Sequence, residues 1–420
     1  MREMKDSGIP WIGEIPKDWT IELIGNQVKE VNNPNTDGLE DNALQFKMGT
    51  IISKSRGDSK YNPETLEGYN IVDKGVIMLN GLNLSFDLIS QRVGLVRERG
   101  VITSTYLAVK PTKNIDSEYL TYLFKAYDNC KAFHSMGRGL RQTLSYGELR
   151  KYLLLYPSLE EQQRIAEFLD RKCAEVDEMI GLQEQIIEEL KAYKQSVITE
   201  AVTKGLNPDA PMRDSSIEWI GQIPEHWEVM QFRRLFEIKK TIANALGYDV
   251  LSVTQGGLKV KDLSANEGQM AQDYSKYQLV GEDDYVMNHM DLLTGFVDCS
   301  KQIGVTSPDY RVFKAKHKSD ISLPFFLRIF QTCYKLRIFY HLGQGVSGMG
   351  RWRLPAEQLK LFSLPIPPLA EQQAIADDLD EKCADIDSLI QTKQSKIDSL
   401  KEYKKSIIYE YVTGKREVNE

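Results

Sequence analysis

A long segment occurs twice in this chain of 420 residues, and its two copies dictate how the rest can be organised. Residues 157–204 align with residues 367–414 at a constant offset of 210, and 24 of the 48 aligned positions are identical. The first copy begins PSLEEQQRIAEFLDRKCAEVD and the second PPLAEQQAIADDLDEKCADID. Shared helical composition alone would not give so many identities, so the segment is a duplicated element.

Both copies carry the pattern of a long helix with a coiled-coil seam. Apolar residues recur at alternating steps of three and four over four heptads, which predicts two helices packed against each other. Prolines lie just before each copy and none lies inside, as uninterrupted helices require. The predicted seam residues are Leu169, Cys173, Val176, Ile180, Ile187, Leu190 and Val197 in the first copy and Leu379, Cys383, Ile386, Ile390, Ile397, Leu400 and Ile407 in the second.

Two matched pairs of polar residues interrupt this seam. They are Gln183 with Lys393, and Lys194 with Lys404. Their side chains either extend past the apolar seam to solvent or fix the register in which the helices pair. The sequence leaves both interpretations open.

Length and composition indicate an ordinary globular protein of two or three domains. Hydrophobic residues make up 41% of the chain and charged residues 27%. No apolar run approaches the roughly 18 residues of a membrane span, and no basic-then-apolar start suggests a signal peptide. Five cysteines without CxxC spacing favour a reducing compartment, so we expect a cytoplasmic protein.

The net charge of −7 argues against a nucleic-acid partner, but its distribution weakens that argument. Residues 159–204 contain six basic and eleven acidic residues, and residues 369–414 contain six and ten. The two repeated segments therefore carry −5 and −4, while residues 1–158 and 205–368 carry +1 each. The globular parts are free to present basic faces, so the charge permits DNA binding without supporting it.

The chain consists of two half-units with the same order of parts. Each opens on the motif W-I-G-x-I-P-x-x-W, at Trp11–Trp19 and Trp219–Trp227. Short strand-like runs, a helical stretch and a glycine-rich basic loop follow, which predicts the α+β class. The two globular regions resemble each other only faintly. The predicted segments are 1–156 (lead and first globular domain), 157–206 (first long helix), 207–366 (lead and second globular domain) and 367–420 (second long helix and tail).

No set of residues suggests catalysis. The sequence has no GxxxxGK[ST] phosphate loop, no GxGxxG after a strand and no HExxH, and its five histidines are scattered. Glu237 and Lys239 match an E-x-K fragment of nuclease sites, a pattern expected by chance in so charged a chain. We therefore predict neither catalytic nor metal-binding residues.

The residues that are present suit base recognition. Arginine reads guanine bidentately in the major groove, and glutamine or asparagine reads adenine. Glycines in both basic loops allow the backbone to approach a ligand closely, and a tryptophan between two arginines could stack or wedge. For any single residue the alternative is a solvated loop side chain. The predicted DNA-binding residues are Arg138, Arg141, Gln142, Asn80, Asn83, Gln255, Asn288, Gln344, Arg351, Trp352 and Arg353.

The whole architecture resembles the specificity subunit of a type I restriction–modification system. The motifs that carry the resemblance are WIGEIPKDW, SLEEQQRIAEFLD, WIGQIPEHW, PPLAEQQAIADDLD and the KxYKxS-I tails. The resemblance implies two target-recognition domains, each reading one half of a bipartite DNA sequence. It also implies that the two long helices form an antiparallel coiled coil between these domains, with a pseudo-twofold internal repeat, that sets the gap and carries the methyltransferase subunits.

The resemblance further implies that catalysis belongs to partners. Two modification subunits would methylate adenine with S-adenosylmethionine, and two restriction subunits would translocate and cut DNA using ATP and Mg²⁺. This chain would bind none of these cofactors and no membrane. The family's base-contacting residues cannot be carried over because recognition domains diverge, so the DNA-binding residues above rest on residue chemistry alone.

Two other functions remain as alternatives. A free-standing DNA enzyme would bind S-adenosylmethionine or cut DNA as a purified chain. A coiled-coil scaffold without DNA affinity would give no half-site-specific footprint in the assembled complex.

Overall fold

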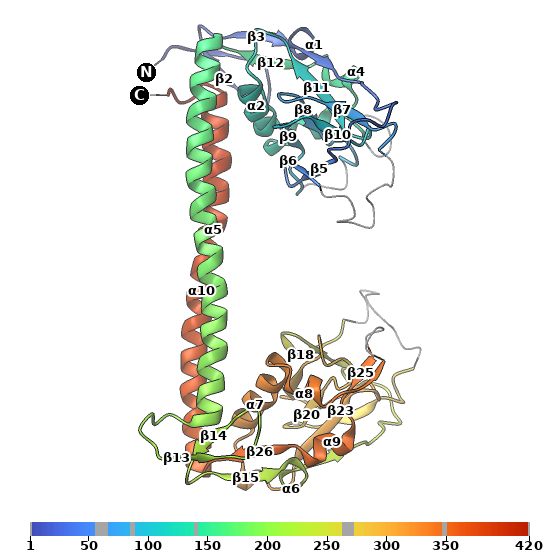
Figure 1. The fold of residues 1–420 in the computed structure, drawn as a ribbon, viewed down its shortest axis with the longest axis vertical. Coiled ribbons are helices and arrows are strands. Elements are labelled where there is room, and N and C mark those ends of the chain that lie inside the picture. Colours follow the sequence, from blue (N-terminus) through green and yellow to red (C-terminus); the bar gives the residue numbers. More distant parts are fainter. Residues whose placement is uncertain are drawn as a thin grey trace. The chain divides into compact units, whose positions relative to one another are not determined.

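The computed structural model describes residues 2–54, 66–84, 89–137, 142–262, 273–346 and 351–418. The chain forms two compact units (Figure 1). The first unit comprises residues 1–184 and 394–420, and the second comprises residues 185–393. Each unit therefore joins one globular domain to part of both repeated helices. The four-segment division of the sequence follows the order of parts instead, and its boundaries stay a prediction.

The duplicated segments are two long helices, α5 (Leu159–Lys204) and α10 (Leu369–Val412). Acidic side chains lie in the first turn of each, where they complement the helix dipole. Gly205 and Gly414 follow the helix ends with φ of +77° and +68°, the left-handed conformation that closes a helix. The predicted long helices are confirmed.

The two helices pair antiparallel, as the resemblance implied. In the first unit the N-terminal half of α5 lies beside the C-terminal half of α10, and in the second unit the reverse halves pair. Lys404 Nζ lies 2.6 Å from Asp177 Oδ2, and Lys194 Nζ lies 2.6 Å from Asp387 Oδ2. These two ion pairs are related by the offset of 210, so Lys194 and Lys404 both contact the opposite helix. All fourteen predicted seam residues are buried or half-buried.

In the described residues, the globular domain of the first unit is built from short strands and four helices. A four-stranded antiparallel sheet has the order β4-β11-β8-β9, and α2 packs against β9 and β11. The strands are β1 (Met4–Asp6), β2 (Glu14–Pro16), β3 (Thr20–Leu23), β4 (Val28–Glu30), β5 (Leu44–Lys47), β6 (Thr50–Ser53), β7 (Asn70–Val72), β8 (Ile77–Leu79), β9 (Val93–Leu95), β10 (Gly100–Ile102), β11 (Leu107–Pro111) and β12 (Leu153–Tyr156). The helices are α1 (Ile24–Gln27), α2 (Ser117–Asn129), α3 (Ala132–Met136) and α4 (Tyr146–Leu149).

The second unit repeats this topology. Its four-stranded sheet has the order β16-β23-β20-β21, and α7 packs against β21 as α2 packs against β9. The strands are β13 (Met212–Asp214), β14 (Gln222–Pro224), β15 (Glu228–Gln231), β16 (Phe236–Lys239), β17 (Leu251–Thr254), β18 (Gly257–Val260), β19 (Gln278–Val280), β20 (Tyr285–Met287), β21 (Val297–Cys299), β22 (Gly304–Thr306), β23 (Arg311–Ala315), β24 (Gln344–Val346), β25 (Arg351–Arg353) and β26 (Ser363–Ile366). The helices are α6 (Phe232–Leu235), η1 (Lys318–Asp320), α7 (Leu323–Lys335), α8 (Ile338–His341) and α9 (Ala356–Leu361).

Four of the two-stranded sheets described in each unit match as well. The pairs β1–β2, β3–β12, β5–β6 and β7–β10 of the first unit recur as β13–β14, β15–β26, β17–β18 and β19–β22. The two domains thus share one α+β fold, although the sequence showed only a faint likeness between them. Strands of three to five residues require only alternating or continuous apolar side chains, so their identities can diverge while the pairing persists.

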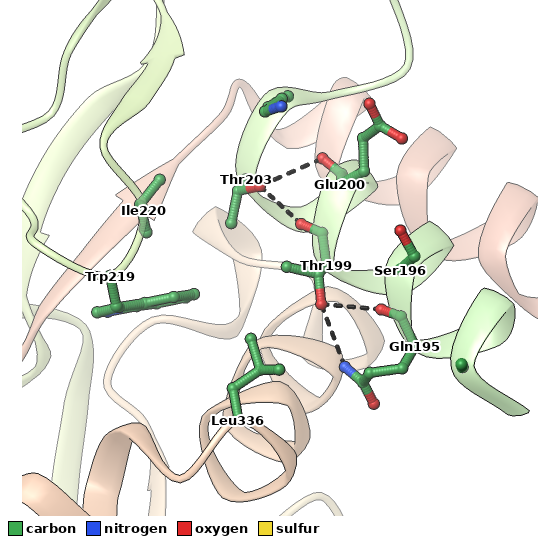
Figure 2. Close-up of a pocket in the computed structure, with 10 residues that line it drawn as sticks. Gln195, Ser196, Thr199, Glu200, Thr203, Trp219, Ile220 and Leu336 are labelled. Carbon is green, nitrogen blue, oxygen red and sulfur yellow. Dashed lines mark hydrogen bonds between the residues drawn. The ribbon is translucent and has the colours of Figure 1, made fainter.

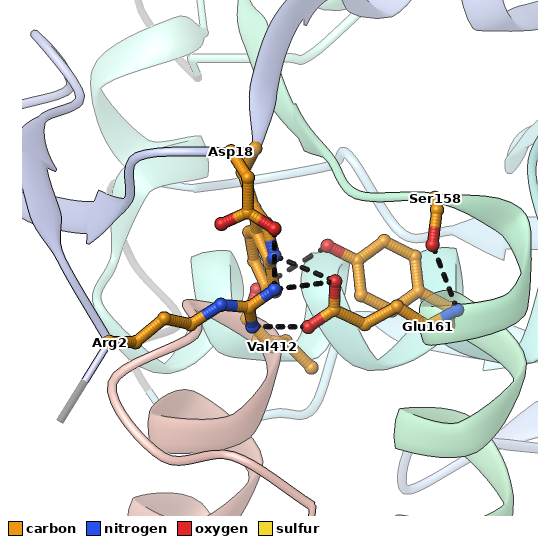
Figure 3. Close-up of polar contacts among 7 residues, drawn as sticks. Arg2, Asp18, Ser158, Glu161 and Val412 are labelled. Carbon is orange, nitrogen blue, oxygen red and sulfur yellow. Dashed lines mark hydrogen bonds and ion pairs between the residues drawn. The ribbon is translucent and has the colours of Figure 1, made fainter.

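The repeated Glu-Gln-Gln motif joins each long helix to the domain beside it. Trp19 Nε1 donates to Glu161 Oε2 at 3.0 Å, and Trp227 Nε1 donates to Glu371 Oε1 at 3.1 Å. Both tryptophans are buried, as amphipathic rings with a partnered N–H can be. Figure 3 shows Glu161 also paired with Arg2, whose Nη1 lies 2.5 Å from Glu161 Oε1. The lead motifs are therefore the surfaces on which the helices are anchored.

Candidate nucleic-acid interface

The structure describes most of the residues predicted to contact DNA. Arg138 and Arg141 lie outside the described residues, and only the backbone of Arg351 is described, in β25. Asn83 precedes the gap after residue 84 and has φ of +50°, a left-handed turn conformation that asparagine tolerates. Nothing further places these four residues against a ligand, and their role stays a prediction.

Asn80 and Asn288 occupy equivalent positions in the two domains. Asn80 follows β8 and Asn288 follows β20, the matching strand of the second sheet. Each side-chain oxygen accepts a hydrogen bond from the backbone N–H two residues later, at 3.3 Å in both domains. Within the described part of the chain, neither side-chain NH₂ group has a hydrogen-bond partner. Each asparagine is therefore held in place by its oxygen and presents two free donors.

The segment that follows each basic loop forms a hydrogen bond with the residue directly after these asparagines. Leu144 N donates to Gly81 O, and Leu354 N donates to His289 O, each at 2.9 Å. Gln142, at φ +43°, is the counterpart of Trp352 at the offset of 210, and its carbonyl accepts from Leu84 N at 3.2 Å. Residues predicted from distant parts of the sequence thus come together at the end of one sheet in each domain.

In the second domain Gln255 and Leu354, the residue after β25, contact the same loop, residues 288–296. Gln255 lies in the turn between β17 and β18, and its Nε2 donates to the carbonyl oxygens of Thr294 and Gly295. Gln344 and Arg353 face each other in the β24–β25 hairpin, and both are exposed. Gln255, Asn288 and Arg353 of this domain therefore lie in or beside one loop.

The Trp352 side chain makes a hydrogen bond and a ring contact within its own domain. Its Nε1 donates to Tyr340 O at 2.7 Å, and its ring lies 5.6 Å from the Tyr340 ring. A Cβ on Gly343 would lie 2.2 Å from Trp352 Nε1, so only glycine fits beneath the indole. The half-buried ring is therefore held by contacts within its own domain, and its role toward a ligand stays a prediction.

Positive charge gathers beside this loop in the second domain. Arg311 on β23 is 8% exposed and donates from Nη1 to Leu354 O at 3.0 Å. Burial lowers the pKa of Arg311 to about 10. Burial, followed by the charges of Arg311, Arg353 and Lys240, lowers the pKa of His289 to about 4. Removal from water disfavours the charged form of both groups.

Sequence reasoning missed Arg311 and His289. Arg311 begins an apolar strand in the run DYRVFKAK, where a charged residue amid buried neighbours is the signal that could have singled it out. His289 follows Asn288 directly, but isolated histidines are common and its position beside Arg311 depends on strand pairing, where Met287 faces Arg311. Only the fold brings these residues together.

Possible metal ligands and the E-x-K fragment can both be located among the described residues. In the described ranges no group of three or more His, Cys, Asp or Glu side chains could hold a metal ion. Lys239 pairs with Asp284, and Glu237 lies 3.9 Å from Lys314, so both residues of the E-x-K fragment face ion-pair partners. None of the helices described combines the length and apolar character needed to cross a membrane.

Comparisons with known proteins agree with the repeated architecture. The family described as "Type I restriction modification DNA specificity domain" matches residues 95–192 and 224–402, one match in each half of the chain. The type I restriction enzyme MjaVIII specificity subunit of Methanocaldococcus jannaschii is 24% identical over 96% of this chain and 93% of its own length.

Solved structures show the same fold. A chain described under "Structural basis underlying complex assembly and conformational transition of the type I R-M system" aligns with a TM-score of 0.67 at 12% identity, over 96% of this chain and 99% of that one. The HsdS subunit from Thermoanaerobacter tengcongensis aligns with a TM-score of 0.50 at 14% identity, over 96% and 98%. The family match covers well over half of the chain. This protein therefore belongs to the type I restriction–modification DNA specificity family and is a specificity subunit.

Proposed function

We propose that this chain is the noncatalytic DNA-recognition subunit of a type I restriction–modification complex and that each globular domain reads one half of a bipartite target. The observation that carries the proposal is the pair Asn80 and Asn288, which present free amide donors at the same point of two domains with one topology. An amide with a fixed oxygen and free donors suits contact with base edges or phosphates.

The residues around these asparagines differ between the domains, which supports two different half-sites. Gln142 of the first domain corresponds to Trp352 of the second, and Arg311 and His289 of the second correspond to Leu107 and Gly81 of the first. A domain fold that stays constant while its surface side chains change can read different bases with the same docking geometry.

The coiled coil would set the spacing of the half-sites and dock the methyltransferase subunits. Both α5 and α10 run without interruption through both units, so a change in helix length passes from one unit to the other. The partners are double-stranded DNA, two methyltransferase subunits and two restriction subunits. S-adenosylmethionine, ATP and Mg²⁺ would bind to those partners, and the complex would act in the cytoplasm.

Methylome mapping of the assembled complex tests this division of labour. Asn80→Ala should relax or weaken one half-site and Asn288→Ala the other, each by about 1–3 kcal/mol, the scale of a good bidentate base contact. Arg141→Ala should likewise affect only the first half-site, and Arg351→Ala only the second. The matched pairs serve as controls for each other, because a defect in folding or assembly would affect both halves.

Two outcomes would contradict the proposal. A variant that altered both half-sites equally would show that the domains do not read independently. A wild-type complex without any half-site-specific footprint would favour a scaffold, and methylation or cleavage by the purified chain alone would favour a free-standing enzyme.

A further inference from the structure

A groove in the second unit lies between the C-terminal half of α5 and the second lead motif. Its volume is about 520 Å³, larger than one aromatic side chain requires. Figure 2 shows Thr199, Glu200 and Thr203 of α5 on one side and Trp219, Ile220 and Leu336 on the other. Polar helix residues thus face an apolar wall across the groove.

The first unit has an equivalent site, and there a side chain of this protein, Tyr409, occupies it. The offset of 210 places Tyr409 at the position of Thr199, and the lead offset of 208 places Trp11 and Ile12 at Trp219 and Ile220. The Tyr409 hydroxyl donates to the carbonyl oxygens of Trp11 and Ile12, both at 3.1 Å. Its ring packs against the core of the first unit.

The two carbonyl oxygens that accept from Tyr409 have counterparts in the second unit, and no described residue donates to them. The lead turns have the same geometry, since Ile12 N donates to Ile9 O at 2.9 Å and Ile220 N to Ile217 O at 3.0 Å. In the part of the chain that the structure describes, the carbonyl oxygens of Trp219 and Ile220 accept no hydrogen bond. Thr199 donates instead to Gln195 O of its own helix, at 2.8 Å (Figure 2).

The rim of the groove carries a complementary difference in charge. In the first unit Arg416 Nε lies 3.0 Å from Glu410 Oε2, and Lys415 Nζ donates to Ile12 O at 2.7 Å. Glu200, the counterpart of Glu410, forms no ion pair among the residues described. The second unit therefore lacks the phenol, and among the residues described no cation pairs with Glu200, although Lys204 also lines the groove.

We propose that this groove binds a tyrosine side chain, flanked by a lysine or arginine, from a methyltransferase subunit. The proposal rests on the proposed function for the identity of the partner. The phenol would donate to the Trp219 and Ile220 carbonyls as Tyr409 does to those of Trp11 and Ile12, and the cation would pair with Glu200. Tyrosine and arginine are the residues that most often anchor interfaces. The contact is available in the second unit only, because Tyr409 occupies its counterpart.

Filling the groove with the first unit's own residue tests the inference in the full-length chain. Thr199→Tyr should place a phenol on the free carbonyls and exclude the partner's side chain. We expect about 30-fold weaker binding at one methyltransferase site, the factor for losing one aromatic anchor. Thr392→Tyr is the matched control, because Thr392 is exposed on α10 and donates to Ser388 O at 2.9 Å as Thr199 does to Gln195 O. Native mass spectrometry and titration with the methyltransferase subunit give occupancy and affinity.

A second variant tests the inference independently, in case Thr199→Tyr does not fold. Glu200→Lys leaves the groove open and reverses the rim charge, and it should weaken the same site. Wild-type affinity in both Thr199→Tyr and Glu200→Lys, or an equal loss in Thr392→Tyr, would overturn the inference. A photo-cross-linker at Ser196 that captured a second copy of this chain would do the same. A wild-type chain that bound no methyltransferase subunit would refute the proposed function itself and, with it, the named occupant.

Discussion

At the scale of single residues, the duplication preserves side chains that satisfy buried backbone groups. Gln162 and Gln372 are buried at 0% and 1% exposure. Gln372 Nε2 donates to Pro367 O at 2.9 Å, and its Oε1 accepts from Ser322 N at 2.8 Å. Gln162 makes the same two bonds, to Pro157 O and from Asp116 N. Each glutamine thus joins the start of a long helix to the N-terminus of the domain helix beside it.

Removing one of these glutamines should destabilise its unit. Gln372→Ala would leave the Pro367 carbonyl and the Ser322 N–H buried without partners, at a cost of about 1–3 kcal/mol for each buried group. The neighbouring Gln373→Ala is the control, because Gln373 is exposed and bonds chiefly to Asp377 on its own helix. Urea unfolding should show a lower midpoint for Gln372→Ala only. Equal midpoints for the two variants would mean that this bridge adds nothing to stability.

His289 should make the second unit sensitive to acid. Its folded pKa of about 4 lies below the ordinary value of 6.5, because burial and the charges of Arg311, Arg353 and Lys240 oppose protonation. The unfolded chain therefore binds more protons between these values, so this contribution to stability is complete above pH 6.5 and is lost as the pH falls toward 4. His289→Gln should flatten the pH dependence of the urea midpoint between pH 7 and 4.5. The exposed His317→Gln should leave that dependence unchanged, and a wild-type slope in His289→Gln would contradict the assignment.

At the scale of elements, the long helices could be predicted and the shared domain fold could not. The seam repeats over four heptads, and proline and glycine mark the helix ends, so local pattern alone specifies α5 and α10. The domain strands are three to five residues long and pair with partners distant in sequence, such as Thr20 with Tyr156. Such pairings are decided by the whole core. The same limit applies to the site: Asn80 and Asn288 were singled out by type, but Arg311 required the sheet register.

The coiled coil should act as a ruler if the proposed function is correct. One heptad that matches the seam can be inserted after Glu184 in α5 and after Lys393 in α10, the points at which the two units divide. Seven residues add about 10 Å of helix, or about three base pairs at 3.4 Å each. Methylome mapping should then show the same two half-sites with a longer gap. A folded, active variant with an unchanged gap would show that the helices do not measure spacing.

At the scale of the whole molecule, the surfaces by which the two long helices pair are close to interchangeable. The interhelical ion pairs Lys194–Asp387 and Lys404–Asp177 differ only by the offset of 210. Two copies of α5 paired antiparallel would therefore form the contact of Lys194 with Asp177 of the other copy twice. The seam residues are similarly matched, as Val176 is to Ile386 and Leu190 to Leu400. A self-complementary surface of this kind closes most simply as a twofold dimer.

We accordingly expect residues 1–206 to form a homodimer with two identical recognition domains. Given methyltransferase subunits, it should modify a palindrome made of the first half-site and its inverted repeat. The charge of −5 on each helix would make pairing weaker at low salt, where repulsion is screened least. Sedimentation and methylome sequencing measure the two properties.

A charge swap makes this prediction specific to the observed pairing. Asp177→Lys in the fragment would replace both ion pairs of the dimer by pairs of like charge. Dimer affinity should fall about tenfold, since each exposed pair contributes up to about 1 kcal/mol. The double variant Asp177→Lys/Lys194→Asp restores both pairs with their signs reversed and should recover the dimer. If the fragment stayed monomeric at micromolar concentration, or modified a non-palindromic site, the two halves would not be interchangeable. If the double variant failed to recover, the homodimer would not use the antiparallel register of the intact chain.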